Sequence, residues 1–501
     1  MRAVYDVSQV RAAEQALMSG LPEGALMERA ATGLADTCAT LLRDLGMPIA
    51  GARAALLVGS GNNGGDALYA GARLAARGMR VSAVILGDRC HAGGLEALLA
   101  AGGTVSASDK DVTSADLVLD GVVGIGGKGA LRAEAARFAR LAADSGALVV
   151  AVDIPSGVDA DTGAVADPGA AVDADVTVTF GCLKPGLVVA PGRDRAGAVV
   201  VVDIGLDASL PRAQAHVLDA SDISMAVPEP GAEDYKYSRG VVGIAAGSPR
   251  YRGAAFMATG SARHGNVGMV HVLDRGDGIA QALVDEFWDV VVSSAAPVAT
   301  ARTTAWVVGP GLGLDHDAIR VLTDVLAVDA PVVVDADALR LLHESGPAAS
   351  LAARTAPTVL TPHVGEFAAL GYVCGSGAAE DRLAAARRAA RELGAIVVLK
   401  GAGTVVASPS GDAFIDTFGT ADLGTAGSGD VLAGLTGALL AGAAARGHLN
   451  EDLAAEVAAA AVGLHGIAGA LAADGGRPVT APDIIASLPA AIAAVRRGTV
   501  S

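Results

Sequence analysis

The chain has 501 residues, which is more than one ordinary hydrophobic core accommodates, and two domains are the natural expectation. Its formal net charge of -17 argues against a nucleic-acid-binding or anionic-membrane surface. Glycine is abundant, with 66 residues, and aromatic residues make up only 3%, so the cores must be built from Ala, Val and Leu. If the protein binds an anion such as phosphate, backbone amides and a few lysines must hold it rather than a basic face.

The four cysteines are far apart and form no Cys-x-x-Cys pair, which disfavours a zinc site or a disulfide framework. They are Cys38, Cys90, Cys182 and Cys374. Residues 1–20 lack the apolar core of a signal peptide. Two long apolar stretches, 431–446 and 453–472, are rich in Ala and Gly, and we interpret them as buried helices rather than membrane spans. Together these features predict a cytoplasmic protein.

The chain begins with two helices and a βα unit. Apolar residues recur every three or four positions over 7–18 and 24–43, which predicts helices. An apolar strand from residue 53 then runs into the turn 62-NNGGD-66, and a helix is expected to start near Asp66. This pattern indicates the first unit of a doubly wound sheet, where ligands bind at the carboxyl ends of strands. The alternative is a turn whose Asn and Gly only tolerate positive φ, with Asp66 as the helix cap.

Strand–helix alternation continues, and two strands end in polar residues. Strands are expected at 80–86, 116–123, 147–152, 175–180 and 198–203, and further helices at 93–101 and 131–145. Asp120 ends one strand and is followed by a glycine-rich loop, whereas Asp153 and Ser156 follow another. Because parallel strands share one carboxyl edge, these side chains and Asn63 could converge there. Their oxygens suit a hard cation, and Asp153 could carry a proton. The alternative is that Asp120 and Asp153 only cap loops.

These motifs resemble the NAD(P)H-hydrate epimerase family. The resemblance is carried by 62-NNGGD-66, by Asp120 with its glycine-rich loop, and by 153-DIPSGVDADTG-163. It implies a Rossmann-like fold over residues 1 to about 205 and interconversion of the R and S epimers of hydrated NADH and NADPH. It also implies that Asp153 carries the proton chemistry and that Asn63, Asp120 and Ser156 bind potassium. The residues implied to bind the hydrate are Asn62, Asn63, Gly64, Gly65, Asp66, Gly124, Ile125, Gly126, Gly127, Lys128, Gly129, Ala130 and Asp153. Ala67 and the loop 124–130 depart from the family's usual pattern.

The pattern breaks between about 204 and 234, where several prolines and charges predict a linker. We therefore expect domains at 1–210 and 235–501, joined by a linker at 211–234. The second half restarts the alternation and indicates a second parallel αβα layer, closed by three helices. Its strand ends carry glycine or polar residues at Gly309–Gly313, Asp335, Asp337, His363 and Lys400.

The stretch 425-TAGSGDVLAGLTGALLAG-442 has the composition of an anion site. Its small residues Ala426, Gly427, Ser428 and Gly429 allow backbone amides to converge at the start of an apolar helix. Asp430 lies in the first turn of that helix. A phosphate held by these amides beside a carboxylate is the minimal equipment for phosphoryl transfer to a hydroxyl. The alternative is a tight loop in which Ser428 and Asp430 are helix caps.

With 309-GPGLG-313 and 400-KGAGT-404, this stretch resembles the ribokinase-like fold. The full set of motifs, including 360-LTPHVGE-366, resembles the narrower family of ADP- or ATP-dependent NAD(P)H-hydrate dehydratases over about 235–500. That family phosphorylates the ring hydroxyl of the S epimer, and loss of phosphate restores the dihydropyridine. The resemblance implies that Asp430 deprotonates the hydroxyl while the 426–429 amides stabilise the phosphate charge. The residues implied to bind the nucleotide are Lys400, Gly401, Ala402, Gly403, Thr404 and Gly429, and those implied to bind the hydrate are Ala254, Gly313, His363 and Asp430.

For two of these residues a structural role is the alternative. His363 could simply start a helix, and Lys400 could be a solvated strand end.

The two resemblances together cover nearly the whole chain and indicate an α/β protein of two αβα domains, the first Rossmann-like and the second ribokinase-like. They imply ADP or ATP with Mg²⁺, potassium, small-molecule substrates, and a homo-oligomer. One alternative is a small-molecule kinase of the hydroxymethylpyrimidine or hydroxyethylthiazole type, fused to a nucleotide-sensing Rossmann-like domain. Another is that the first half only binds a nucleotide and stiffens the second half.

Overall fold

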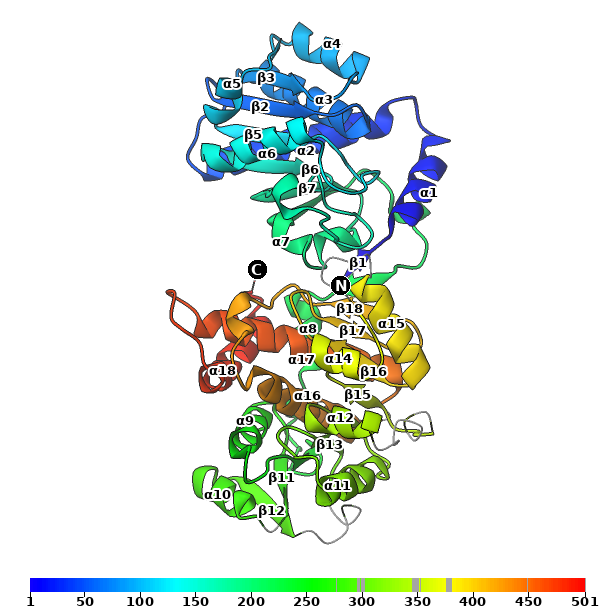
Figure 1. The fold of residues 1–501 in the computed structure, drawn as a ribbon, viewed down its shortest axis with the longest axis vertical. Coiled ribbons are helices and arrows are strands. Elements are labelled where there is room, and N and C mark those ends of the chain that lie inside the picture. Colours follow the sequence, from blue (N-terminus) through cyan, green and yellow to red (C-terminus); the bar gives the residue numbers. More distant parts are fainter. Residues whose placement is uncertain are drawn as a thin grey trace. The chain divides into compact units, whose positions relative to one another are not determined.

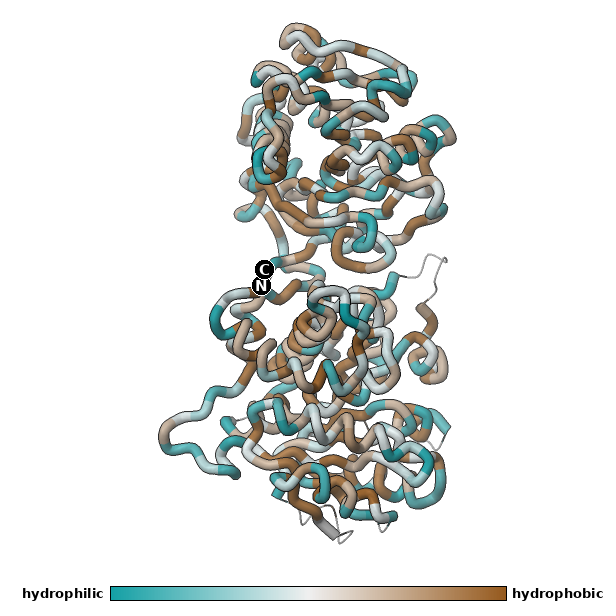
Figure 2. The backbone as a smooth tube through the Cα atoms, turned by 90° about the vertical axis from the view of Figure 1, so that its left-hand side faces the viewer, coloured by the Kyte–Doolittle hydropathy of each residue, from teal (hydrophilic) through white to brown (hydrophobic). Residues whose placement is uncertain are grey.

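The computed structural model describes residues 1–500 except 276, 295–297, 299–301, 345–350, 352, 375–380 and 448. The described chain forms two compact units, one of residues 3–214 and the other of residues 1–2, 215–374 and 382–501 (Figure 1). Along both units, hydrophobic runs of the backbone alternate with hydrophilic connections (Figure 2). The α/β class is confirmed, since each unit is built on its own sheet with helices packed against it.

The first unit has a seven-stranded parallel sheet in the order β4-β3-β2-β5-β6-β7-β8. Its strands are β2 (Arg53–Val58), β3 (Arg80–Ile85), β4 (Thr104–Val105), β5 (Leu117–Gly121), β6 (Leu148–Val152), β7 (Val176–Phe180) and β8 (Ala198–Val202). Its helices are α1 (Val7–Met18), α2 (Ala25–Asp44), α3 (Asn62–Ala76), α4 (Ala92–Ala100), α5 (Asp109–Thr113), α6 (Ala133–Ser145) and α7 (Arg193–Ala196). The helices and strands predicted for this half are confirmed within a few residues at their ends.

Side chains of β2 alternate between two buried layers, as the period of a strand requires. Leu56 and Val58 pack in a core with α2 and α3, whereas Ala55 and Leu57 pack in a second core with Phe138 of α6. This arrangement covers both faces of the sheet and leaves its carboxyl edge to the loops.

The run 62-NNGGD-66 is not a turn before the helix, as its composition suggested. Helix α3 begins at Asn62 with Gly61 as its cap, and Asp66 lies inside the helix. Gly64 and Gly65 do not adopt positive φ. A Cβ at Gly64 would lie 2.3 Å from the carbonyl oxygen of Gly59, so the glycine is needed because α3 passes close to the end of β2.

An eleven-stranded sheet, whose strands other than β1 lie within the second unit, has the order β1-β9-β18-β17-β16-β15-β14-β13-β10-β11-β12. Its strands are β1 (Arg2–Val4), β9 (Ala215–Val217), β10 (Val241–Ala245), β11 (Met269–Asp274), β12 (Val290–Ser294), β13 (Ala305–Val308), β14 (Val332–Val334), β15 (Thr358–Leu360), β16 (Ile396–Leu399), β17 (Val405–Ala407) and β18 (Ala413–Ile415). Its helices include α8 (Ala220–Ala226), α9 (Arg252–Ala262), α10 (Ile279–Glu286), α11 (His316–Leu326), α12 (Asp337–Glu344), α14 (Val364–Ala369), α15 (Arg382–Leu393), α16 (Ser428–Ala445), α17 (Glu451–Ala472) and α18 (Ala481–Arg497).

We expected a wholly parallel sheet, but this sheet is mixed. The strands from β12 to β16 are parallel, but β17 runs antiparallel to both β16 and β18. The connection from β17 to β18 is a short turn in which Ser408 N donates to Asp412 O at 2.8 Å. Such a short connection permits only a hairpin, because a parallel crossover needs a dozen or more residues.

The segment 211–234 also differs from the expected linker. It contains β9 and α8, and Ile223 of α8 lies in the main core of the second unit. Helix α8 is capped by Asp219, whose carboxylate accepts from Ser221 N and Asp222 N, so the charged residues there start a helix.

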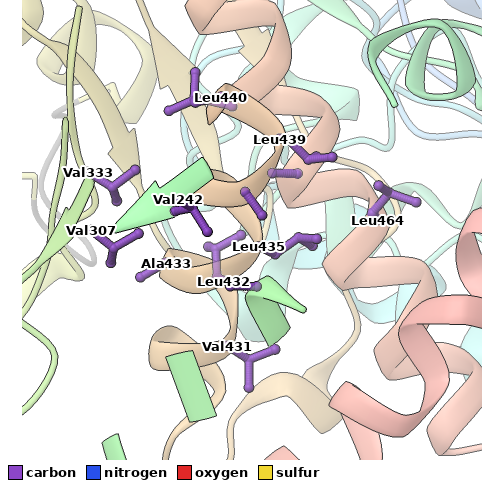
Figure 3. Packing of buried hydrophobic residues seen from close by; sticks show 14 of the residues in the cluster. Val242, Val307, Val333, Val431, Leu432, Ala433, Leu435, Leu439, Leu440 and Leu464 are labelled. Carbon is purple, nitrogen blue, oxygen red and sulfur yellow. The ribbon is translucent and has the colours of Figure 1, made fainter. Parts of the chain in front are cut away.

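Helices α16 and α17 form the centre of the second unit. Figure 3 shows Leu432, Leu435 and Leu439 of α16 between the strand residues Val242 and Val307 and Leu464 of α17. Both helices are long and apolar enough to cross a membrane, but 72% and 83% of their apolar windows are buried inside the protein. The structure therefore agrees with their interpretation as core helices of a folded unit.

Candidate active sites

Asp120 and Ser156 form a buried pair at the carboxyl edge of the first sheet. The Asp120 carboxylate accepts from Ser156 N at 2.8 Å and from Ser156 Oγ at 2.7 Å, with a longer bond from Val122 N. Both residues are fully buried. Burial raises the pKa of Asp120 to about 6, against the lowering effect of these hydrogen bonds. The predicted convergence of the ends of β5 and β6 is confirmed for this pair.

Asn63 lies beside the loop that follows Asp120. A Cβ at Gly124 would lie 2.8 Å from Asn63 Oδ1, so the start of this loop passes directly over the amide. The amide nitrogen of Asn63 is buried without a hydrogen-bond partner in the described part of the chain. Because Val123 N donates to Ser156 Oγ at 2.9 Å, the loop joins Asn63 to the Asp120–Ser156 pair.

Asp153 is paired with a lysine that the sequence interpretation missed. Its Oδ1 accepts from Lys184 Nζ at 2.7 Å, from Thr179 Oγ1 at 2.9 Å and from Phe180 N at 3.2 Å. Lys184 is 1% exposed, and its ammonium also donates to Thr179 Oγ1 and to Phe180 O. Asp153 itself adopts a φ of 66°, which is unusual outside glycine. The only sequence signal for Lys184 is its position in the apolar run 182-CLKPGL-187.

A cavity of about 1030 Å³ opens beside this cluster. Its polar lining includes Glu14, Asn62, Asp66, Tyr69 and His91, and its apolar lining includes Phe180 and Ile204. The described structure therefore puts Asn62 and Asp66 on the cavity, whereas Asn63, Gly64 and Gly65 are buried beside it.

The loop 124–130 supplies none of the cavity-lining residues within the described chain. Ile125 packs against the core that contains α2 and α3. Lys128 is exposed and donates to Asp159 at 2.8 Å, so its charge is directed to the loop after β6. Gly126, Gly129 and Ala130 are exposed.

The second site is built on the first turn of α16. Gly427 is the cap residue, with a φ of 87°, and the amides that follow it are those of the helix start. Asp430 lies in this turn, as predicted. Burial raises the pKa of Asp430 to about 7, and the Asp335 carboxylate adds to the rise while Lys400 opposes it. A carboxyl group that titrates near neutrality is suited to exchanging a proton.

Lys400 connects Asp430 to two further carboxylates. Its ammonium donates to Asp335 at 2.9 Å and lies 3.8 Å from Glu366. A Cβ at Gly429 would be 3.2 Å from Lys400 Nζ, so the ammonium reaches the start of α16. Burial lowers the pKa of Lys400, but the Asp335 and Glu366 carboxylates outweigh it and the net shift is upward. Lys400 is thus not a solvated strand end, which excludes the alternative for this residue.

His363 starts a helix, as its alternative role predicts. Its Nδ1 accepts from Gly365 N at 2.9 Å and from Glu366 N at 3.2 Å, while Glu366 accepts from His363 N at 2.8 Å. The backbone of His363 bridges to Lys400, so two predicted ligands lie at adjacent strand ends. Because its side chain is 60% exposed, a further role in ligand binding is compatible with the capping role.

The remaining predicted ligands lie along the same edge. Gly313 N donates to Asp337 Oδ2 at 2.9 Å, and Asp337 is one of the charges that act on Asp430. Ala254 lies against the loop 309–313, since a Cβ at Gly311 would be 2.9 Å from its Cβ. Residues 400–404 form a tight turn closed by Thr404 Oγ1, which donates to Gly401 O at 3.0 Å.

His465 of α17 was not expected at this site. Its Nε2 lies 3.1 Å from Ser428 Oγ, and burial lowers its pKa to about 4. The imidazole is therefore neutral beside the helix start, and Ser428 is held from the side of the core. An isolated histidine in an Ala-rich helix gave no signal for this contact.

Comparison with known proteins agrees with the division into two sites. The family model described as YjeF-related protein N-terminus matches residues 23–186, and the model described as NAD(P)H-hydrate dehydratase matches residues 242–490. The bifunctional NAD(P)H-hydrate repair enzyme of Mycobacterium tuberculosis is 45% identical over 420 residues, which cover 84% of this chain and 85% of that protein. Its counterpart in Mycobacterium leprae is 44% identical over 424 residues, which cover 84% and 85%. The NAD(P)H-hydrate epimerase of Microbacterium testaceum is 43% identical over 242 residues, which cover 46% of this chain and 90% of that protein.

Solved structures resemble part of the chain. An ADP/ATP-dependent NAD(P)H-hydrate dehydratase from Bacillus subtilis, co-crystallised with ATP and Mg²⁺, is 26% identical with a TM-score of 0.47, and the match covers 56% of this chain and 99% of that one. A ribokinase-like superfamily protein from Enterococcus faecalis is 24% identical with a TM-score of 0.49, and the match covers 57% and 98%. On the sequence identity over most of its length, this chain belongs to the family of bifunctional NAD(P)H-hydrate repair enzymes.

Proposed function

We propose that this chain repairs hydrated NADH and NADPH by two reactions on one polypeptide. The first unit interconverts the R and S epimers of the hydrate, and the second unit removes water from the S hydrate with ADP or ATP. One observation carries the proposal. In each of the two matched spans, a largely buried aspartate lies at the carboxyl edge of the sheet. These are Asp153 within 23–186 and Asp430 within 242–490.

In the second unit, Asp430 takes the proton of the ring hydroxyl while the hydroxyl oxygen attacks the terminal phosphorus of the nucleotide. A pKa of about 7 lets this carboxylate accept a proton under neutral conditions. The new O–P bond forms as the bond to the leaving nucleotide breaks. Loss of phosphate together with a proton from the neighbouring ring carbon then restores the dihydropyridine. The amides of 426–429 and the Lys400 ammonium stabilise the transferred charge.

Lys400, Gly401, Ala402, Gly403, Thr404 and Gly429 hold the nucleotide in this proposal, and Ala254, Gly313 and His363 hold the hydrate. When bound, Mg²⁺ would neutralise part of the negative charge of the nucleotide phosphates. In the described part of the chain no group of three or more His, Cys, Asp or Glu is spaced to hold a metal. In this proposal Mg²⁺ arrives bound to the nucleotide phosphates, as this ion commonly does.

In the first unit, Asp153 carries proton chemistry of the epimerisation. Lys184 compensates the charge of its carboxylate and fixes its position through the hydrogen bond at 2.7 Å. The cavity beside it, about 1030 Å³, has room for a nucleotide-sized ligand.

Asn63, Asp120 and Ser156 would hold potassium at the same edge. Their chemistry fits, because a carboxylate, a hydroxyl and the carbonyl oxygen of an amide can all serve as oxygen ligands. The test is thermal melting in KCl and in NaCl of equal ionic strength. We expect a higher melting temperature in KCl for the wild type and no difference for Ser156→Ala. An equal difference in the variant and the wild type would contradict the site.

The proposed function is tested by incubating the protein with a mixture of both hydrate epimers, with and without ADP or ATP. Recovery of dihydronicotinamide absorbance from both epimers, only when nucleotide is present, is the expected result. Recovery from one epimer alone would leave the first unit without its proposed activity. Accumulation of a stable phosphorylated alcohol would contradict dehydration and indicate a kinase.

We also propose a cytoplasmic location, which the four free cysteines support. Cell fractionation with an antibody against the chain tests it, and recovery outside the cytoplasmic fraction would contradict it.

A further inference from the structure

Three buried carboxyl groups lie at the edge of the first sheet, but they differ in what they bind. Asp153 and Asp120 each accept three hydrogen bonds, and one of the donors to Asp153 is the Lys184 ammonium. Asp66 is 9% exposed. Among the residues that the structure describes, no donor or cation pairs with its carboxyl group, so burial is not compensated there.

Helix α3 directs Asp66 into the cavity. Asn62, Asp66 and Tyr69 lie on one side of the helix and all line the cavity. Asn63 and Ala67 lie on the other side, against the end of β5, where a Cβ at Gly121 would be 2.6 Å from Ala67 Cβ and 3.1 Å from Asn63 O. The carboxyl group of Asp66 is therefore accessible to a ligand in the cavity and separate from the Asp120–Ser156 pair.

The surroundings of Asp66 favour its neutral form. Burial raises its pKa well above the usual value, and the charges of Asp153 and Glu14 raise it further. The other ionisable groups on the cavity are Glu23, Glu28, Tyr69 and His91. Glu28 is already paired with Arg73, and Lys184 is committed to Asp153.

We propose that Asp66 is the general acid of the epimerisation and acts together with Asp153 as the base. This inference rests on the proposed function of the first unit, and it gives Asp66 a catalytic role in place of simple substrate binding. Asp66 lines the cavity and Asp153 lies in the cluster beside it, so one carboxyl group can give a proton and the other can take one, as exchange of a hydroxyl group requires.

The chemistry balances without any further reactant. Water added across an enamine double bond places the hydroxyl on the ring carbon next to nitrogen. The C–O bond breaks as the nitrogen lone pair forms a C=N bond, and Asp66 gives its proton to the departing oxygen, which leaves as water. The carbon is now planar, and water adds to its other face while the C=N electrons return to nitrogen. Asp153 takes the proton of the added water, and proton exchange with solvent in the cavity restores both groups.

The Asp66→Asn variant tests this step, since an amide keeps the size and can donate a hydrogen bond but gives no proton. The full-length chain is assayed with the pure R epimer by following the appearance of the S epimer. We expect kcat to fall about 100-fold or more, with KM changed by less than threefold, because general acid catalysis contributes about that much. The decline of kcat on the alkaline side of the pH profile, where the wild-type acid loses its proton, should disappear.

Two comparisons keep the result decisive. Asp144→Asn, an exposed residue of α6 on the opposite face of the sheet, should leave both activities unchanged. Nucleotide-dependent dehydration of the S epimer by Asp66→Asn should match the wild type, which shows that the chain is folded.

Three outcomes would overturn the proposal. They are a kcat for Asp66→Asn within tenfold of the wild type, a loss confined to KM, and a loss of kcat in Glu14→Gln that Asp66→Asn does not share. A wild-type chain that fails to interconvert the epimers would instead overturn the proposed function of the first unit, and this inference with it.

Discussion

Asp153 in the first unit and Asp430 in the second lie at equivalent edges of their sheets, and each has a lysine nearby. In the first unit the lysine is hydrogen-bonded directly to this aspartate, since Lys184 Nζ donates to Asp153 at 2.7 Å. In the second unit the lysine is hydrogen-bonded to a different carboxylate, since Lys400 Nζ donates to Asp335 at 2.9 Å. Asp430 is left among carboxylates, and burial together with Asp335 raises its pKa to about 7.

The difference teaches that a nearby lysine does not by itself set the protonation of an aspartate. What matters is which carboxylate holds the direct hydrogen bond, because a direct charge-assisted bond is stronger than attraction at longer range. In the first site, the charge of the Asp153 carboxylate is balanced by Lys184, and the reaction proposed there transfers no phosphate. The second site presents a carboxyl group that can gain or lose a proton near neutrality beside an anion site.

The largest expected effect is on Asp430. Asp430→Asn should lower nucleotide-dependent dehydration by about 1,000-fold or more, since it removes the base and its charge at once. Epimerisation, measured on the same sample, should be unchanged if the two sites are independent. Asp474→Asn, an exposed residue between α17 and α18, is the matched control. Loss of both activities in Asp430→Asn would break the comparison, because the sites would then not be separate.

Removing Lys184 should have the next largest effect. Lys184→Met leaves the Asp153 carboxylate buried without a cation, and we expect epimerisation to fall about 100-fold. Lys110→Met, at an exposed position of α5, is the control. Epimerisation by Lys184→Met within tenfold of the wild type would contradict this role.

The pH dependence of dehydration sharpens the comparison further. If Asp430 must be ionised to act, the rate should rise about tenfold per pH unit on the acid side and level off above about pH 7, the pKa of this group. Since the Lys400 charge lowers the pKa of Asp430, Lys400→Met should shift the bend to higher pH as well as reduce the rate. A rate that is independent of pH between 5 and 8 would contradict this role.

The smallest effect concerns stability. Burial raises the pKa of Asp430 from its usual value of 3.8 to about 7, so the folded chain binds a proton more tightly than the unfolded chain. The associated stability is present below pH 3.8 and is lost as the pH rises through about 7. Relative to the wild type, Asp430→Asn should therefore be more stable by about 2 kcal/mol at pH 8, after allowance for partial exposure, and equal near pH 4. Thermal melting at the two pH values checks this, and a stabilisation that is the same at both would contradict it.

Much of this architecture followed from local patterns. Period-two and period-3.6 hydrophobicity identified the strands of the first sheet and helices such as α1 and α2, because those periods reflect which face is buried. The approach of Ser156 to Asp120 was expected because parallel strands end at one edge. Antiparallel β17 and the helical start of α3 were missed, since a short hairpin and close helix–strand packing depend on neighbours that are distant in sequence.

The sequence by itself determined the two-unit α/β organisation, the aspartate in the first turn of α16 and the family, because these depend on local periodicity and on ordered motifs. Only the tertiary structure decided that Lys184 belongs to Asp153, that Lys400 belongs to Asp335, and that Asp66 lies in the cavity without a partner among the described residues. The physical reason is that protonation depends on burial and on charges within a few ångströms, and the groups concerned come from strands and helices far apart in the chain.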